Sequence, residues 1–420
     1  MIVNSLLDKK LWSKELVSWY LYDLAISMVF INLTLYFSEW VVVDNHFTDF
    51  WFSLPFILAT IVLIFISSYV GRKGDTRGWH FKIFMGATTA SLVAVLFIFL
   101  AGRLLAGVPS VVLALIFFGL YQLFMQLAFV PYYSFIKHIS TEKTYGRVSG
   151  IGFAFGQLGN LAGILLTLPV INGQITIFGA DRLSPLIPVM IAFIIFALPS
   201  YFAFRNKKLP RLKVVEKEPF WKSFVLNLKR SRDHPGVLPL LISFYLFSDA
   251  IQTIILYSSI YLQKVFSIPD SAKAIIFIVV LLGFILGAAG GGVLSDRLNR
   301  RLNLIVSLIA SSISIMLIAL NGWPSLVIYV FFIYGLSTGW TFASSRSYFA
   351  YLIPKKESGT FFGLYTFAER VASVVGPAIW GIIIFIFVKM QPSNYRVAAF
   401  VMGLIVLSGV IPLIIGKFKK

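Results

Sequence analysis

Ser18-Trp19-Tyr20-Leu21-Tyr22-Asp23 and Ser243-Phe244-Tyr245-Leu246-Phe247-Ser248-Asp249 are two closely similar stretches, and each places one aspartate in an otherwise apolar segment. A carboxylate at bilayer depth is costly unless it faces a cavity, a pathway or a partner. Its recurrence in both halves of the chain predicts a duplicated membrane bundle, with a polar site on the axis that relates the halves.

The composition supports a membrane protein. Of the 420 residues, 58% are hydrophobic, 16% aromatic and only 13% charged, and the mean hydropathy is +0.87. These values exceed the apolar content of a soluble domain, and the long apolar runs match the thickness of a bilayer. The net charge of +19 indicates no nucleic-acid partner here, because the position of the charges matters more than their sum.

Hydropathy predicts an all-α membrane protein with twelve transmembrane helices in two pseudo-symmetric six-helix bundles. The N-terminal bundle is expected over residues 1–204, a basic linker over 205–235, and the C-terminal bundle over 236–420. The predicted spans are residues 16–43, 50–70, 82–101, 109–136, 146–171, 184–204, 236–263, 272–294, 303–320, 325–352, 358–388 and 395–416.

The basic residues lie mainly on one side of these spans. Of the 36 Lys and Arg residues, 28 fall in the termini and the even-numbered loops, and six fall in the opposite loops. This bias predicts that both termini are cytoplasmic. The plasma membrane is the expected location of this multi-pass protein. No signal peptide is expected, because the N-terminus lacks a cleavage site and leads directly into the first span. The absence of cysteine excludes disulfides and cysteine-ligated metals.

Two loops repeat one pattern at equivalent places in the halves. Gly71-x-x-x-Asp75-x-Arg77 follows the second span, and Gly292-x-x-x-Asp296-Arg297 follows the eighth. Glycine lets two helices approach closely, and aspartate can accept hydrogen bonds from a helix N-terminus or from an arginine. The six residues Gly71, Asp75, Arg77, Gly292, Asp296 and Arg297 are therefore expected to form a cytoplasmic gate. The pattern resembles the loop motif of the major facilitator superfamily.

A sharper resemblance follows the tenth span. Ser345-Arg346, Leu352-Ile353-Pro354, Phe361-Phe362-Gly363-Leu364-Tyr365 and Ser373-x-x-Gly376-Pro377 resemble the unknown-major-facilitator family, which includes vacuolar autophagy-related amino-acid effluxers. This resemblance implies the twelve-helix major facilitator fold and an amino acid or similar zwitterion as substrate. Ile26, Tyr133, Ala250 and Glu369 depart from that family's pattern, so the substrate of this chain can differ.

Polar residues inside the predicted spans can be placed by the helical period. Tyr20, Asp23, Ser27 and Thr34 share one face of the first span. The residues expected to line a central cavity, for substrate binding or proton coupling, are Asp23, Asp249, Tyr20, Gln126, Gln157, Asn160, Gln252, Arg346, Glu369 and Arg370.

The chemistry of these side chains suggests roles. An arginine fork matches a carboxylate, so Arg346 or Arg370 is a candidate for a substrate carboxylate, and Asp23 or Asp249 for an amine. A structural alternative stays open for each: interhelix hydrogen bonds for the aspartates and amides, neutralisation of other charges for Glu369 and Arg370, and snorkelling to the surface for Arg346.

Glycine stripes on two other spans predict close helix packing. Gly152, Gly156, Gly159 and Gly163 lie on one face of the fifth span, and Gly283, Gly287, Gly290 and Gly291 lie on the eighth. We expect these faces to let the two halves rock against each other.

The sequence therefore predicts a secondary active transporter of an amino acid or similar zwitterion, working by alternating access. Protons are a candidate coupling ion, a small molecule and the lipid bilayer are the expected partners, and a monomer is expected. No phosphate-binding loop or metal-ligand spacing occurs, so neither enzyme activity nor a cofactor is expected. Two alternatives are a proton-coupled sugar or glycoside symporter and a lipid flippase or scramblase.

Overall fold

The computed structural model shows an all-helical protein over the residues that it describes, which are 8–47, 49–177, 181–207 and 220–417, together with Leu6, Gly179 and Leu209. Eleven helices in this part are long and apolar enough to cross a membrane. The two parts of α3, Trp51–Leu63 and Phe65–Arg77, are bent by 47° and make the twelfth when taken as one span. The expected fold class is confirmed.

The spans follow the predicted order. The first consists of α2 (Lys14–Asn32) and two short π-helical turns, η2 (Leu33–Phe37) and η3 (Trp40–Asp44). The remaining N-terminal spans are α3 (Asp49–Arg77), α4 (His80–Leu104), α5 (Val108–Ile139), α6 (Tyr145–Ile171) and α7 (Leu186–Phe204). The C-terminal spans are α9 (Val237–Phe266), α10 (Asp270–Arg297), α11 (Arg300–Leu320), α12 (Val327–Leu352), α13 (Ser358–Ile386), and α14 (Ser393–Ser408) with α15 (Val410–Ile415).

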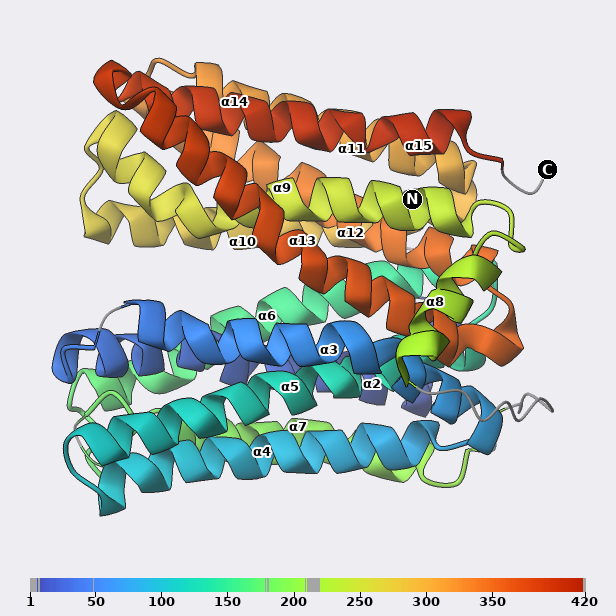
Figure 1. The fold of residues 1–420 in the computed structure, drawn as a ribbon, viewed down its shortest axis with the longest axis horizontal. Coiled ribbons are helices and arrows are strands. Elements are labelled where there is room, and N and C mark those ends of the chain that lie inside the picture. The colour runs from blue at the N-terminus through green and yellow to red at the C-terminus, as the bar shows by residue number, and fades with distance from the viewer. Residues whose placement is uncertain are drawn as a thin grey trace.

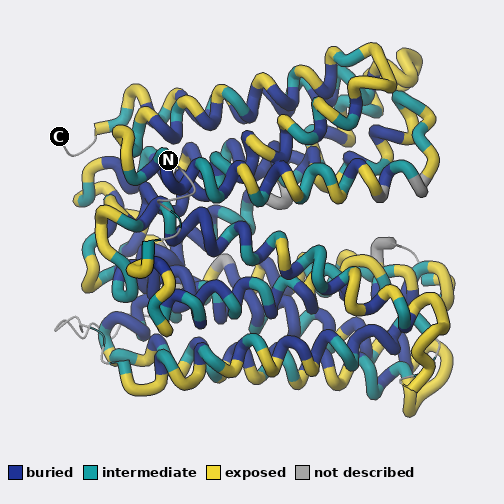
Figure 2. The backbone as a smooth tube through the Cα atoms, turned by 180° about the vertical axis from the view of Figure 1, so that it is seen from behind, coloured by how far each residue is buried: buried dark blue, intermediate teal, exposed yellow. Residues whose placement is uncertain are grey.

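The helices form two groups of six spans that lie side by side (Figure 1). Between the groups, α6 packs on α10 and α3 packs on α13. The groups lie closest at the end of the molecule that carries α8 and α15 (Figure 1), and their helices diverge toward the other end (Figure 2). We call the first the terminal end, and the opposite one the far end. The site described below lies between the two groups.

The first span changes pitch partway along its length. A π-helix has wider turns than an α-helix, so η2 and η3 rotate the side chains that follow Asn32. Thr34 is exposed, and its hydroxyl donates to the carbonyl of Phe30 in the same helix. That Thr34 shares the face of Tyr20 and Asp23 stays a prediction.

Most glycines of the two stripes pack within one half. On α6, a β-carbon at Gly159 or Gly163 would overlap the backbone of α2, at Leu24 and Met28. On α10, Gly283, Gly287 and Gly291 lie against α12 in the same way. The expectation that these faces are rocking surfaces between the halves is therefore wrong for these five glycines, whereas a β-carbon on Gly152 of α6 would also meet Nη2 of Arg346 from the other half. The close approach between the halves is made by other glycines, at the terminal end.

The linker contains a short amphipathic helix, α8 (Phe220–Arg230), which packs on α3 and α13 at the terminal end (Figure 1). Asn227 on α8 is fully buried, and its Nδ2 donates to Oγ of Ser68 over 2.7 Å. Because residues 210–219 lie outside the described part, the linker limits of 205–235 stay a prediction.

Candidate substrate site between the two halves

Asp23 and Arg346 come from opposite halves and form an ion pair in the interior. Asp23 lies on α2, Arg346 lies on α12, and Nη1 of Arg346 is 3.9 Å from Oδ2 of Asp23. The arginine side chain is 1% exposed and the aspartate side chain is 12% exposed. The pair is therefore buried on the arginine side and reached by solvent on the aspartate side.

Ser149, a second residue of the N-terminal half, accepts two hydrogen bonds from Arg346. Nε of Arg346 donates to Oγ of Ser149 over 3.0 Å, and Nη2 donates to the carbonyl oxygen of Ser149 over 2.6 Å. The Ser149 hydroxyl in turn donates to the carbonyl of Ala343 on α12. One edge of the guanidinium is thus used by Ser149 on α6, while Nη1 has no hydrogen-bond partner among the described residues.

Aromatic rings of the N-terminal half surround this guanidinium. Its central carbon lies 4.0 Å from the ring centre of Phe153, 5.0 Å from Trp19 and 5.6 Å from Tyr133. Trp19 is itself fixed by stacking on Tyr132 and by donating to the Tyr132 carbonyl. Such faces stabilise a buried cation. The structural alternative in which Arg346 snorkels to the surface is wrong, because its guanidinium group is buried against side chains of the N-terminal half.

Asp249 has different surroundings from Asp23, although the sequence pairs the two. Oδ1 of Asp249 accepts a hydrogen bond of 2.8 Å from the backbone N–H of Gly376 on α13. Both residues belong to the C-terminal half. A β-carbon at Gly376 would overlap the side chain of Thr253, which shows how closely α9 and α13 approach. Asp249 thus joins two helices within one half, and Asp23 joins the two halves.

Several of the predicted site residues are buried with polar atoms that lack a hydrogen-bond partner among the described residues. They include the hydroxyl of Tyr20, both amide atoms of Gln126, Oδ1 of Asn160 and Oε2 of Glu369. Buried polar groups in proteins are nearly always paired. Unpaired polar atoms inside a membrane bundle can be satisfied by water or by a polar solute.

Two pairs of predicted residues contact each other within their own helices. On α6, Nδ2 of Asn160 donates to Oε1 of Gln157 over 3.1 Å. On α13, Nη2 of Arg370 lies 3.3 Å from Oε1 of the adjacent Glu369. Gln252 on α9 is half-buried. Arg346 is the predicted site arginine for which an ion pair with the other half is observed.

At the terminal end, Asp75 binds the start of α13. Its carboxylate accepts from the backbone N–H groups of Gly359 and Thr360, over 2.9 and 2.7 Å, and from the Thr360 hydroxyl over 2.7 Å. His80 Nε2 is 3.1 Å from the same carboxylate. A β-carbon on Gly71 would overlap the carbonyl oxygen of Gly359, so glycine is required for this approach. We call these contacts the Asp75 latch.

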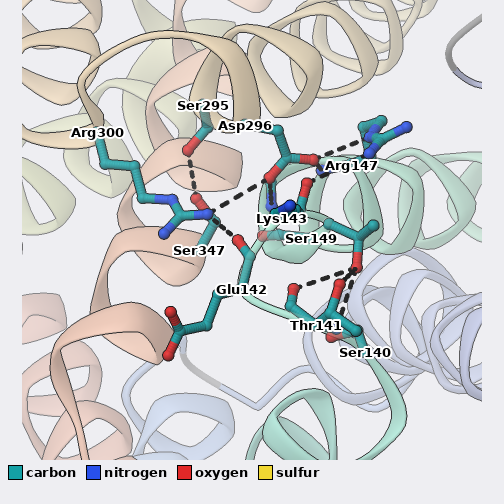
Figure 3. Close-up of polar contacts among 12 residues, drawn as sticks. Ser140, Thr141, Glu142, Lys143, Arg147, Ser149, Ser295, Asp296, Arg300 and Ser347 are labelled. Atoms are coloured by element: carbon teal, nitrogen blue, oxygen red, sulfur yellow. Dashed lines mark hydrogen bonds and ion pairs between the residues drawn. The ribbon is translucent and has the colours of Figure 1, made fainter.

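Asp296 makes the matching contacts at the start of α6 (Figure 3). It accepts from the backbone N–H groups of Gly146 and Arg147, over 2.6 and 3.0 Å, and from Nε of Arg147 over 3.0 Å. Arg300 lies 3.8 Å away and also donates to the carbonyl of Glu142. A β-carbon on Gly292 would overlap the carbonyl of Gly146. This set, the Asp296 latch, relates to the Asp75 latch by exchange of the halves.

The two predicted gate arginines lie elsewhere. Arg77 is exposed and its guanidinium stacks on Trp79, and Arg297 is also exposed. The arginines that contact Asp296 are instead Arg147 and Arg300. The loop pattern did not identify Arg147 and Arg300, because the spacing of residues does not show which side of a helix end faces the other half.

Sequence reasoning also missed Ser149 and Trp19, which contact Arg346. A serine or tryptophan in an apolar helix carries no signal of its own, and the contact joins residues 197 positions apart for Ser149. Among the described residues, no group of three His, Cys, Asp or Glu side chains is arranged to hold a metal ion.

The chain matches the model of one protein family and several known proteins. The family model, described as vacuole effluxer Atg22 like, matches residues 31–417. The chain is 23% identical to the MFS-type transporter YxiO of Bacillus subtilis (strain 168), over 95% of both chains. It is 24% identical to autophagy-related protein 22-2 of Aspergillus clavatus, over 61% of this chain and 46% of that protein.

A solved structure shares the fold. The outward conformation of FucP, a major facilitator superfamily transporter, superposes with a TM-score of 0.74 at 12% sequence identity, covering 97% of this chain and 98% of that one. At this identity the likeness concerns the fold alone. It agrees with the two groups of six spans and with their approach at one end.

Proposed function

Since the chain belongs to the vacuole effluxer Atg22-like family of major facilitator transporters, we propose that it is a secondary active transporter of an amino acid or a similar small zwitterion. The two halves would alternate in opening at the terminal end and at the far end. The Lys and Arg bias supports a cytoplasmic terminal end, and the plasma membrane is the proposed location.

The observation that carries this proposal is the Asp23–Arg346 pair. An α-amino acid bears a carboxylate and an ammonium group a few ångströms apart, and the pair offers one partner of each sign. Nη1 of Arg346 can donate to a carboxylate, and Asp23 can accept from an ammonium group. Because the two side chains belong to different halves, a ligand held by both would bridge the halves.

Proton coupling is a further part of the proposal. A carboxyl group that takes up a proton on one side of the membrane and releases it on the other is the minimum requirement for such coupling. Asp23 is suited to this task because its side chain is 12% exposed, so solvent reaches it, while it faces a buried cation. No cofactor and no ATP are required.

Proton movement in proteoliposomes tests the proposal. The purified protein is reconstituted with a pH-sensitive dye inside the vesicles, and pooled amino acids and pooled sugars are added separately under an imposed gradient. A proton flux evoked by amino acids is the expected result. A response to sugars alone would move the assignment to a sugar or glycoside symporter. No response to either pool would leave uncoupled transport, or a lipid flippase or scramblase, as the alternatives.

A further inference from the structure

Arg346 connects the two halves at a level deeper than the Asp75 and Asp296 latches. It lies six residues before the terminal end of α12 and contacts α2, α5 and α6 of the other half. Opening the terminal end by moving the halves apart must withdraw this arginine from all three helices. We propose that Ser149, Arg346 and Asp23 form an inner latch, which holds the terminal end closed only while Asp23 carries its negative charge.

Different nitrogen atoms of the Arg346 guanidinium contact Ser149 and Asp23. Its Nε and Nη2 atoms donate hydrogen bonds of 3.0 and 2.6 Å to Ser149. These bonds fix the position of the Arg346 side chain against α6. Its Nη1 atom is directed to Asp23 at 3.9 Å, a distance at which charge attraction acts without a formed hydrogen bond. Ser149 is therefore the positioning residue, and Asp23 is the residue whose charge can be changed.

The latch depends on charge because Arg346 is buried only when the halves are together. A buried cation that loses its counter-ion is strongly destabilising, whereas the same cation in water is not. When Asp23 becomes neutral, the closed arrangement therefore loses stability relative to the arrangement in which Arg346 is hydrated. The neutral contacts to Ser149 and the rings remain, so the closed state is weakened and the fold of each half is kept.

Other groups face Asp23 from the elements packed around it. Tyr132 on α5 contributes a hydroxyl group and Glu369 on α13 contributes a second carboxylate nearby. Within the described part of the chain, the positive charge within ion-pair distance of Asp23 is that of Arg346. A proton on Asp23, or an ammonium group of the proposed substrate bound to it, would change the same interaction.

Asp249 supplies a matched control. It is a buried aspartate in the corresponding span of the other half, and its carboxylate accepts from Gly376 within that half. Asp249→Asn removes the same charge and keeps an oxygen that can accept this hydrogen bond. It should leave the contacts between the halves unchanged.

The absence of cysteine from the chain permits a direct measurement. Lys143 and Lys356 are exposed in loops of opposite halves at the terminal end, and Gln174 and Lys389 are exposed on opposite halves at the far end. Each pair is replaced by cysteine and labelled with nitroxides, and distances between labels are measured by pulsed electron resonance in liposomes without substrate.

We expect Asp23→Asn to lengthen the terminal-end distance and to shorten the far-end distance, with the ratio of terminally open to closed molecules raised about tenfold or more. Asp249→Asn should keep the wild-type distributions. Unchanged distributions in Asp23→Asn, or the same shift in both variants, would overturn the inner latch. The inference rests on the proposed alternating access, but the measurement uses no substrate, so failure to transport amino acids is a separate result.

Ser149→Ala gives an independent test if Asp23→Asn does not fold. The variant removes the hydroxyl that accepts from Nε, whereas Ser149→Thr retains a hydroxyl at that position. The alanine variant should shift both label pairs in the same directions as Asp23→Asn, and the threonine variant should restore the wild-type distances. Wild-type distances in the alanine variant would show that Ser149 does not position the arginine.

Discussion

Arg346 is the residue on which the proposed substrate site and the inner latch both depend. It binds Ser149 through two atoms, faces Asp23 with a third, and lies over three aromatic rings. Only a planar guanidinium can present separate donors in these directions at once. A lysine at this position would keep the charge but would have a single nitrogen to share.

We therefore expect Arg346→Lys to lower the initial rate of amino-acid uptake into proteoliposomes by about tenfold or more, because the second donor edge is lost. Arg77→Lys is the control, since Arg77 is exposed at the terminal end. Equal rates in the two variants would mean that the guanidinium geometry is unimportant. The amount of folded protein in each preparation is checked by size-exclusion chromatography.

At the scale of single residues, the sequence could predict which polar side chains lie inside the membrane but not which of them meet. Asp23 and Asp249 are recognisable because an aspartate in an apolar span is rare. Their different partners follow from tertiary packing. The spacing of residues in one helix contains no information about a contact such as Ser149 with Arg346, which crosses between two halves.

Among the helices, α6 and α10 determine how closely the halves approach at the terminal end. A β-carbon on Gly292 would overlap the carbonyl oxygen of Gly146, whereas a β-carbon on Gly290 of the same helix would meet no atom within 4 Å. The two glycines are two residues apart on the same helix, and only the β-carbon at Gly292 would overlap the other half. They therefore form a natural pair of test and control.

Gly292→Ala should lower the midpoint of thermal unfolding in detergent, because overpacking a tight contact costs about 1–3 kcal/mol. Gly290→Ala should leave the midpoint unchanged or raise it slightly, since alanine is the better helix former by about 1 kcal/mol. A Gly292→Ala protein as stable as Gly290→Ala would contradict the close approach of α6 and α10.

The linker helix α8 is held against the N-terminal half by Asn227. Replacing Asn227 with alanine removes its hydrogen bond to Ser68 and leaves a buried hydroxyl, at a cost of about 1–3 kcal/mol. We expect the amide hydrogens of α8 to exchange about tenfold faster in this variant. Val225→Ala is the control because Val225 is exposed, and equal exchange in both variants would show that Asn227 does not anchor the helix.

The sequence predicted the elements well because each span is long and uniformly apolar. It failed where an element departs from the regular α-helix or where two elements face each other. The π-helical turns after Asn32, for example, interrupt the regular period of the first span. The glycine stripes indicated close packing, but their partners, α2 and α12, follow from the arrangement of the bundle rather than from the stripes.

For the whole molecule, the orientation in the membrane stays a prediction from the distribution of Lys and Arg. In the cysteine-free chain, Lys389→Cys lies in the loop between α13 and α14 at the far end, and Lys417→Cys lies at the terminal end. A membrane-impermeant maleimide should label Lys389→Cys in intact cells and Lys417→Cys only after the membrane is permeabilised. The reverse pattern would place the terminal end outside the cytoplasm.

Both latches at the terminal end join an aspartate side chain of one half to main-chain N–H groups of the other, at Arg147 and at Thr360. A main-chain donor is present whatever residue occupies its position, except proline. The main-chain part of each contact therefore does not depend on which residue occupies the donor position, whereas the side chains of Arg147 and Thr360 add contacts that do. A search for covarying positions among relatives of this chain should detect the side-chain contacts and miss the main-chain ones, although both connect the halves.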